Sequence, residues 1–201
     1  MAACEANPSA DKAAFLKTNQ QFFPSQHILI SCGTVPVDPT TNKIALLRDT
    51  SNNTYHLPKG RKNIDEDLLA AALRETYEET GLSVTPLPLK VATRATPTQD
   101  MLGTFAIGAN PDVTDGLLNC EVSSVCVYPC VYTGAFKMVF WFAAMVDSTA
   151  VPDVGTREAW EEHLKLEWVD APEAAAMMAF KSNGQVIDKV LADMRNSGYQ
   201  I

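Results

Sequence analysis

The chain has 201 residues, 46% apolar and 20% charged, which is enough to bury one substantial hydrophobic core. Its formal net charge of −8 argues against binding a nucleic-acid backbone over a broad face. No apolar run approaches the roughly 20 residues that span a membrane, and the N-terminus lacks the apolar core of a secretory signal. These features predict a cytoplasmic or nuclear protein.

The first quarter of the chain predicts a peripheral segment followed by strands. Residues 1–25 read as peripheral, with a short helix capped by Ser9, and residues 26–201 read as one domain. Apolar and β-branched residues then predict three strands, separated by turn residues, over 27–37, 42–49 and 54–58.

A helix of about four turns is predicted next. Asn63 fits an N-cap, and Glu66, three residues later, would complete a capping box. Gly81 stands where a left-handed glycine ends a helix. Residues at helical spacing predict a buried stripe of Leu68, Leu69, Ala72, Leu73 and Thr76.

The second half of the chain predicts strands, one long loop and two closing helices. A strand is expected over 88–95, followed by an irregular insertion at about 96–124; loops of that length are often functional. The remaining expected elements are a hairpin of strands 124–132 and 136–146, a strand over 164–170, and helices over 171–180 and 184–196.

The five cysteines are an odd number, and their spacing matches no common zinc pattern. We therefore expect free thiols, as in a reducing compartment. The cysteines are Cys4, Cys32, Cys120, Cys126 and Cys130.

Three acids crowd the predicted helix. Glu75, Glu78 and Glu79 share one helical face, where like charges destabilise an isolated helix by a few tenths of a kcal/mol per pair. A solvated helix face usually mixes both signs, yet Arg74 is the only base of this helix. Clustered carboxylate oxygens suit Mg²⁺ or Mn²⁺, whose binding would relieve the repulsion.

A basic loop precedes this helix. Gly60 would let the backbone approach an ion or a phosphate closely, because glycine carries no side chain. Lys59, Arg61 and Lys62 surround it and suit phosphate oxygens. The alternative is a solvated basic loop with no ligand.

The segment from Gly60 to Leu82 resembles the signature box of the Nudix hydrolases. Thr76 stands where that family usually has an aliphatic residue, and it is small enough to pack there. With the flanking strands, the resemblance extends over about 26–180. It implies an α/β (α+β) fold, an α/β/α sandwich with a mixed central sheet. The matching box residues are Gly60, Glu66, Arg74, Glu75, Glu78, Glu79, Gly81 and Leu82.

The resemblance implies a metal-dependent enzyme that hydrolyses a diphosphate linked to another moiety. Glu78 and Glu79 would be the main metal ligands, together with the carbonyl group of Gly60. Glu75 would be a further ligand or the general base, and Arg74 would orient a glutamate. Such chemistry relies on positioning and charge neutralisation, which fits these residue types.

Other acids are candidates for the general base, because some members of the family use a glutamate outside the box. Glu158, Glu161 and Glu162 precede the strand expected at 164–170 and are such candidates. The alternative is that these acids form a solvated face.

The substrate is less sharply indicated. The stretch "LPKG" resembles the start of the box in dinucleoside polyphosphate hydrolases and in diphosphoinositol polyphosphate phosphohydrolases. The expected substrate-binding cations Lys59, Arg61, Lys62 and Arg48 favour the very highly charged inositol pyrophosphates. Against this, Arg61 follows Gly60 at the position where the inositol subgroup commonly has a second glycine. ADP-ribose and oxidised nucleotides stay open, whereas the acidic balance argues against mRNA decapping.

Aromatic residues and one histidine have structural alternatives. Trp141, Tyr128 and Tyr132 could stack on a base, but their alternation along strands favours packing. His56 beside a strand end is more often structural than catalytic. A ligand-sensing module without turnover is the non-enzyme alternative, which the complete set of box acids argues against.

Overall fold

The structure is a computed structural model, and it describes residues 18–98, 100–101 and 113–201. The strands are β1 (Ile28–Asp38), β2 (Lys43–Asp49), β3 (Thr54–His56), β4 (Lys59–Arg61), β5 (Thr85–Pro86), β6 (Ser124–Pro129), β7 (Phe136–Met145) and β8 (Leu164–Asp170). The helices are α2 (Leu68–Thr80), α3 (Ala171–Met177) and α4 (Lys181–Asn196), with short 3-10 turns η1 (Ser25–His27) and η2 (Ala159–Glu161).

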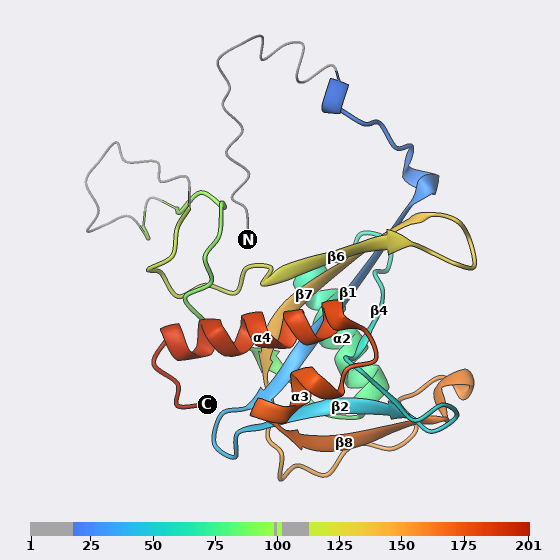
Figure 1. The fold of residues 1–201 in the computed structure, drawn as a ribbon, viewed down its shortest axis with the longest axis vertical. Coiled ribbons are helices and arrows are strands. Elements are labelled where there is room, and N and C mark those ends of the chain that lie inside the picture. Colours follow the sequence, from blue (N-terminus) through green and yellow to red (C-terminus); the bar gives the residue numbers. More distant parts are fainter. Residues whose placement is uncertain (1–17, 99, 102–112) are drawn as a thin grey trace.

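These strands form one mixed sheet. Its main path runs β3-β2-β1-β7-β5, while β4 pairs with β1, β6 with β7 and β8 with β2. β1 and β7 run parallel from the pair Ile28–Phe136 to the pair Val37–Met145, and the other pairs are antiparallel. Helix α2 lies on one face of the sheet, and α3 and α4 lie on the other (Figure 1). The expected α/β/α sandwich with a mixed sheet is thus confirmed.

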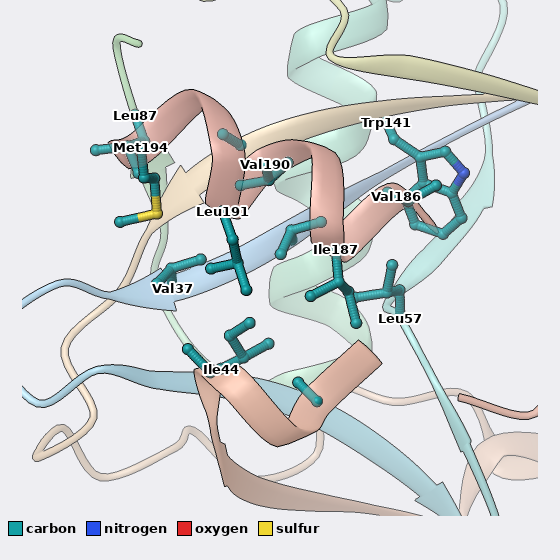
Figure 2. Packing of buried hydrophobic residues seen from close by; sticks show 14 of the residues in the cluster. Val37, Ile44, Leu57, Leu87, Trp141, Val186, Ile187, Val190, Leu191 and Met194 are labelled. Atoms are coloured by element: carbon teal, nitrogen blue, oxygen red, sulfur yellow. The ribbon is translucent and has the colours of Figure 1, made fainter. Parts of the chain in front are cut away.

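Alternation along β1 gives each face its own core. Val35 and Val37 belong to the large cluster beneath α3 and α4, whereas Cys32 packs with Ala71 of α2. Figure 2 shows the large cluster, in which α4 contributes Val186, Ile187, Val190, Leu191 and Met194.

The start of α2 differs from the prediction. The helix begins at Leu68, and its N-cap is Asp67, whose carboxylate accepts hydrogen bonds from the N–H groups of Leu69 (2.9 Å) and Ala70 (3.2 Å). The Asn63 N-cap was therefore wrong. The N–H of Asn63 does donate to Glu66 at 2.8 Å. However, the two residues belong to a turn before the helix, in which Asp65 has a φ of 60°.

The end of α2 confirms the predicted glycine cap, because Gly81 has a φ of 73° and its N–H donates to the carbonyl of Tyr77. The predicted buried stripe is correct at Ala72 and Thr76, while Leu68, Leu69 and Leu73 are half-buried. The helix instead buries two further small or polar positions near its end, Glu79 and Thr80.

Most other elements follow the predictions within a few residues, although α4 begins at Lys181, three residues early. The strand predicted over 88–95 was wrong, since only the isolated bridges Leu89–Asn119 and Thr93–Thr114 form there. Pro88 offers no N–H for a continuous ladder. The short strands β4 and β5 were not predicted.

Several predictions lie outside the described residues: the helix capped by Ser9 in large part, Cys4, and residues 102–112 of the insertion. Among the described cysteines, Cys32, Cys120, Cys126 and Cys130 are free. Within the ranges described, no helix combines the length and apolar character needed to cross a membrane. The domain limits 26–201 stay a prediction.

Candidate active site

Helix α2 and strand β4 lie side by side and bring the predicted acids to the predicted glycine. Gly60 packs so closely on Glu75 that a Cβ added to it would collide with the carboxylate of Glu75. Gly60 pairs with Cys32, whose side chain packs beneath α2. A side chain at residue 60 would therefore point towards the same helix. The missing side chain is therefore what allows this approach.

Arg74 joins four groups of the site. It binds Glu66 through Nε (2.7 Å) and Nη2 (2.8 Å), and its Nη1 donates to Glu75 (2.7 Å) and Glu78 (2.8 Å). Its Nη2 also donates to the carbonyl of Arg61 at 3.0 Å. The hydrogen bonds from Arg74 lower the pKa of Glu66 to about 2, and those acids raise the pKa of Arg74 in turn.

Glu79 is the most deeply placed of the acids, with 7% of its surface exposed. It accepts a hydrogen bond from the N–H of Lys59 at 2.8 Å, yet burial raises its pKa to about 8. Burial also raises the pKa of Glu75, despite its bond to Arg74. Both carboxylates thus sit where a bound cation would favour their ionised form.

A cavity of about 630 Å³ opens over Glu75 and Glu78. Glu158 and Glu161 line the cavity and form a capping box at the start of η2, in which the side chain of each accepts the backbone N–H of the other. The charge of Glu161 helps to raise the pKa of both Glu75 and Glu79. Glu162 lines a separate pocket instead. The residues lining the cavity are Gly60, Arg61, Asn63, Arg74, Glu75, Glu78, Thr156, Glu158, Trp160 and Glu161.

The predicted substrate-binding cations lie in different places. Arg61 lines the cavity, whereas Lys59 is not among the lining residues and donates its main-chain N–H to Glu79. Lys62 donates to the carbonyl of Asn63 at 2.8 Å. Arg48 forms a 2.7 Å ion pair with Glu167 on β8 and is not among the lining residues.

Sequence reasoning missed Trp160, which lines the cavity while 71% of its surface is exposed. Its position between the candidate acids Glu158 and Glu161 was the available signal. Trp141, by contrast, is buried in the core. His56 bonds through Nε2 to the hydroxyl of Thr54 at 2.7 Å, and burial lowers its pKa, which fits a structural role.

The donor set suits a divalent cation, because the acids around Gly60 offer only hard oxygens. In the part of the chain that the structure describes, no three of these side chains converge as a formed metal cluster. Arg74 instead holds one oxygen of Glu75 and one of Glu78. Ligation would therefore need these carboxylates to turn from Arg74 towards the metal.

Comparisons with known proteins agree with this geometry. The NUDIX domain model matches residues 30–190. A NUDIX hydrolase from Nitrosomonas europaea is 17% identical with a TM-score of 0.51, covering 86% of this chain and 93% of that one. An Ap4A hydrolase of C. elegans, in a binary complex, is 18% identical with a TM-score of 0.53, covering 84% and 98%.

The MutT protein from Methanosarcina mazei Go1 is 16% identical with a TM-score of 0.51, covering 88% of this chain and 99% of that one. A search of the curated proteins found no match. At these identities the solved structures establish the fold alone, whereas the domain model covers most of the chain. The chain therefore belongs to the NUDIX domain family and is a hydrolase acting on phosphoric anhydride bonds.

Proposed function

We propose that the protein is a Mg²⁺- or Mn²⁺-dependent pyrophosphohydrolase whose substrate carries a diphosphate linked to a highly anionic moiety, with diphosphoinositol polyphosphates as the favoured class. One observation supports it most strongly: Glu75 packs against the bare backbone of Gly60, and Gly60, Glu75 and Glu78 line the same cavity. Family membership supports divalent-metal use in general.

Glu78, Glu79, Glu75 and the carbonyl group of Gly60 would hold the metal. When bound, the metal would lower the pKa of a water molecule and neutralise charge on the diphosphate. The protein's own groups fix this arrangement, since Arg74 holds Glu75 and Glu78 and the N–H of Lys59 holds Glu79.

Glu161 is the candidate to receive the proton of the attacking water, because it shares the cavity with Glu75 and influences its pKa. The water oxygen then bonds to phosphorus, the bridging P–O bond breaks, and its electron pair leaves with the departing phosphate oxygen. Glu75 is the alternative acceptor. Glu162 lines a different pocket, which weighs against it.

A dinucleoside polyphosphate is the second candidate substrate, and Trp160 is the observation that favours it. An indole ring exposed over a polar cavity is suited to stacking on a nucleobase. The C. elegans protein of the same fold is described as an Ap4A hydrolase. Arg61 on the cavity wall suits the phosphates of either substrate class.

We propose an anionic small molecule, and neither nucleic acid nor membrane, as the partner of this protein. The net charge of −8 supports the exclusion of nucleic acid. The free cysteines of the described ranges support a location in the cytoplasm or nucleus.

The test measures phosphate and product release with and without Mg²⁺, for wild type and Glu79→Gln. The panel contains a diphosphoinositol polyphosphate, a diadenosine polyphosphate, ADP-ribose and an oxidised nucleoside triphosphate. We expect metal-dependent turnover of the favoured class, lost in the variant. Preference for the diadenosine compound, reduced by Trp160→Ala, would establish the second candidate. Tight binding of a panel compound without turnover would instead indicate a ligand-sensing module.

A further inference from the structure

The three residues of β4 face two different sides of the sheet. Gly60 lies against Glu75 on the α2 side. Lys59 pairs with Gly33, and a Cβ added to Gly33 would lie 2.6 Å from the Cβ of Lys59 and 2.6 Å from the ring of Trp141. Trp141 belongs to the cluster beneath α4. The side chain of Lys59 therefore lies on the α4 side.

Two more cations join Lys59 on that side. Arg61 pairs with Ser31, two residues before Gly33 on β1, so strand alternation directs its side chain the same way. Lys137 of β7 alternates with Val139 and Trp141, which both belong to the α4-side cluster. We call Lys59, Arg61 and Lys137 the cationic group.

The members of the cationic group influence one another electrostatically. The pKa of Lys137 is lowered first by burial and next by the charge of Lys59, with a smaller contribution from Arg61. Cys130 and, more weakly, Glu79 act in the opposite direction, but both act more weakly than Lys59. The ammonium group of Lys137 lies 5.7 Å from the centre of the Tyr128 ring. Three like charges thus share one surface, on which Lys59 and Lys137 are half-buried and Arg61 is exposed.

No described carboxylate forms an ion pair with the cationic group within 4.0 Å. This is unusual in a chain with a net charge of −8. Other cations of the same structure do have acidic partners; examples are Lys43 with Asp170, Arg48 with Glu167 and Lys189 with Asp193. Like charges held together without an ion-pair partner favour an anion from outside.

Unpartnered polar atoms on the same side are an independent observation. The hydroxyl groups of Ser31 and Ser124 and the Nε1 of Trp141 are buried and have no hydrogen-bond partner among the residues that the structure places. Ser124 pairs with Trp141 across β6 and β7. Figure 2 shows Trp141 at one end of the row of core side chains. Buried donors without partners are rare and call for a ligand or a water.

The cationic group borders the cavity at Arg61. In the described chain, β4 pairs with β1 alone, so its other edge is not bonded to a strand. Arg61 already lines the cavity.

We propose that Lys59, Arg61 and Lys137 form a second anion subsite, across β4 from the carboxylates, which binds a phosphoryl group of the substrate other than the diphosphate that is cleaved. This inference rests on the proposed function and makes it more specific. The phosphoryl group could belong to a polyphosphate chain or to a phosphorylated ring, since both present the same oxygens to the cations.

The test separates binding from turnover. Equilibrium binding of two probes, inorganic tripolyphosphate and inositol hexakisphosphate, is measured by calorimetry in EDTA, so that the carboxylates hold no metal. We expect Lys137→Met to weaken binding of at least one probe by about tenfold, the loss typical of one charge-assisted hydrogen bond. Lys165→Met, which removes an exposed lysine on β8, should change it less than about twofold, and Lys137→Arg should retain most affinity.

Kinetics provide the second measurement. For a substrate with additional phosphoryl groups, Lys137→Met should raise KM about tenfold with kcat nearly unchanged, because the lost contact is made in both ground and transition states. ADP-ribose has no phosphoryl group besides its diphosphate. For this substrate, Lys137→Met should therefore change KM no more than Lys165→Met does. Preference for tripolyphosphate indicates a chain, and preference for inositol hexakisphosphate indicates a ring.

Each outcome is decisive for one claim or the other. If wild type binds neither probe, or if Lys137→Met and Lys165→Met behave alike, the subsite is overturned, while turnover on the panel would still support the proposed function. If no panel compound is hydrolysed but binding depends on Lys137, the subsite stands and the proposed function fails.

Discussion

The two sides of β4 carry opposite charges and differ in whether those charges have partners within the protein. On the α2 side, Glu75 and Glu78 share one arginine, Arg74, and Glu79 is buried with a raised pKa. On the α4 side, the cationic group has no acidic partner among the described residues. One strand of three residues separates them, because successive side chains of a strand point to opposite faces.

This difference shows how a protein of net charge −8 can bind a polyanion. The acidic side is preorganised by Arg74, which holds the carboxylates of Glu75 and Glu78 in place before a metal binds. The basic side is preorganised by the strand register, which fixes Lys137 beside β1 through ten parallel residue pairs. We therefore assign the metal to the acidic side and the remaining charge of the substrate to the basic side.

The largest expected effect comes from replacing the glycine between the two sides. In Gly60→Ala, the new Cβ would displace the carboxylate of Glu75 and disturb its bond to Arg74. A misplaced catalytic group costs roughly 10²-fold in rate, so we expect kcat to fall by about that factor with little change in Tm. Steady-state kinetics and thermal unfolding measure the two effects.

Gly116→Ala is the matched control, because an added Cβ there meets nothing within 4 Å. It should leave both kcat and Tm nearly unchanged. Full activity of Gly60→Ala would mean that the close packing of β4 on Glu75 does not position the acidic side.

A smaller effect is expected in the pH dependence of stability. Hydrogen bonds from Arg74 lower the pKa of Glu66 to about 2, from an ordinary value of 4.5. The stabilisation is complete above the ordinary pKa and is lost as the pH falls towards 2, because only the unfolded state then takes up the proton. Glu66→Gln should therefore be less stable at neutral pH and lose less stability on acidification.

Urea unfolding at several pH values between 2 and 7 measures this difference. The two stability curves should converge as the pH falls. Curves that stay parallel over the whole range would show that the Glu66–Arg74 pair does not stabilise the acidic side.

The smallest effect concerns the sheet-facing side of α2. The hydroxyl of Thr76 lies 2.7 Å from that of Thr34 and donates to the carbonyl of Ala72 at 2.8 Å. Thr76→Val would leave Thr34 unpaired and should cost about 1–2 kcal/mol, with turnover nearly unchanged. Restoring stability with the double variant Thr34→Val, Thr76→Val would confirm the cause, whereas a large loss of kcat would link this contact to the acidic side.

The acidic side was accessible to sequence reasoning because its information is local. Helical spacing alone places Glu75, Glu78 and Glu79 on one face, and Gly60 is close enough in the chain to be tied to them. The helix start was misplaced because Asn63 and Glu66 do form the expected hydrogen bond, but in a turn before the helix. Asp67, the true cap, was an equally acceptable residue type.

The basic side was only partly accessible because its information is non-local. Lys59 and Arg61 were identified as cations, but their shared face depends on the pairing of β4 with β1. Lys137 joins them only through the parallel register of β1 and β7, which no local pattern determines. The strand predicted over 88–95 failed for the same reason, because a strand needs a pairing partner that the local sequence does not reveal. This segment forms only isolated bridges.

The most direct test of the central claim is Mn²⁺ binding, followed by electron paramagnetic resonance, for wild type, Glu79→Gln and Lys137→Met. We predict saturable binding to wild type, at least about tenfold weaker binding to Glu79→Gln, and nearly unchanged binding to Lys137→Met. Equal Mn²⁺ affinity of wild type and Glu79→Gln would contradict the assignment of the metal to the acidic side of β4.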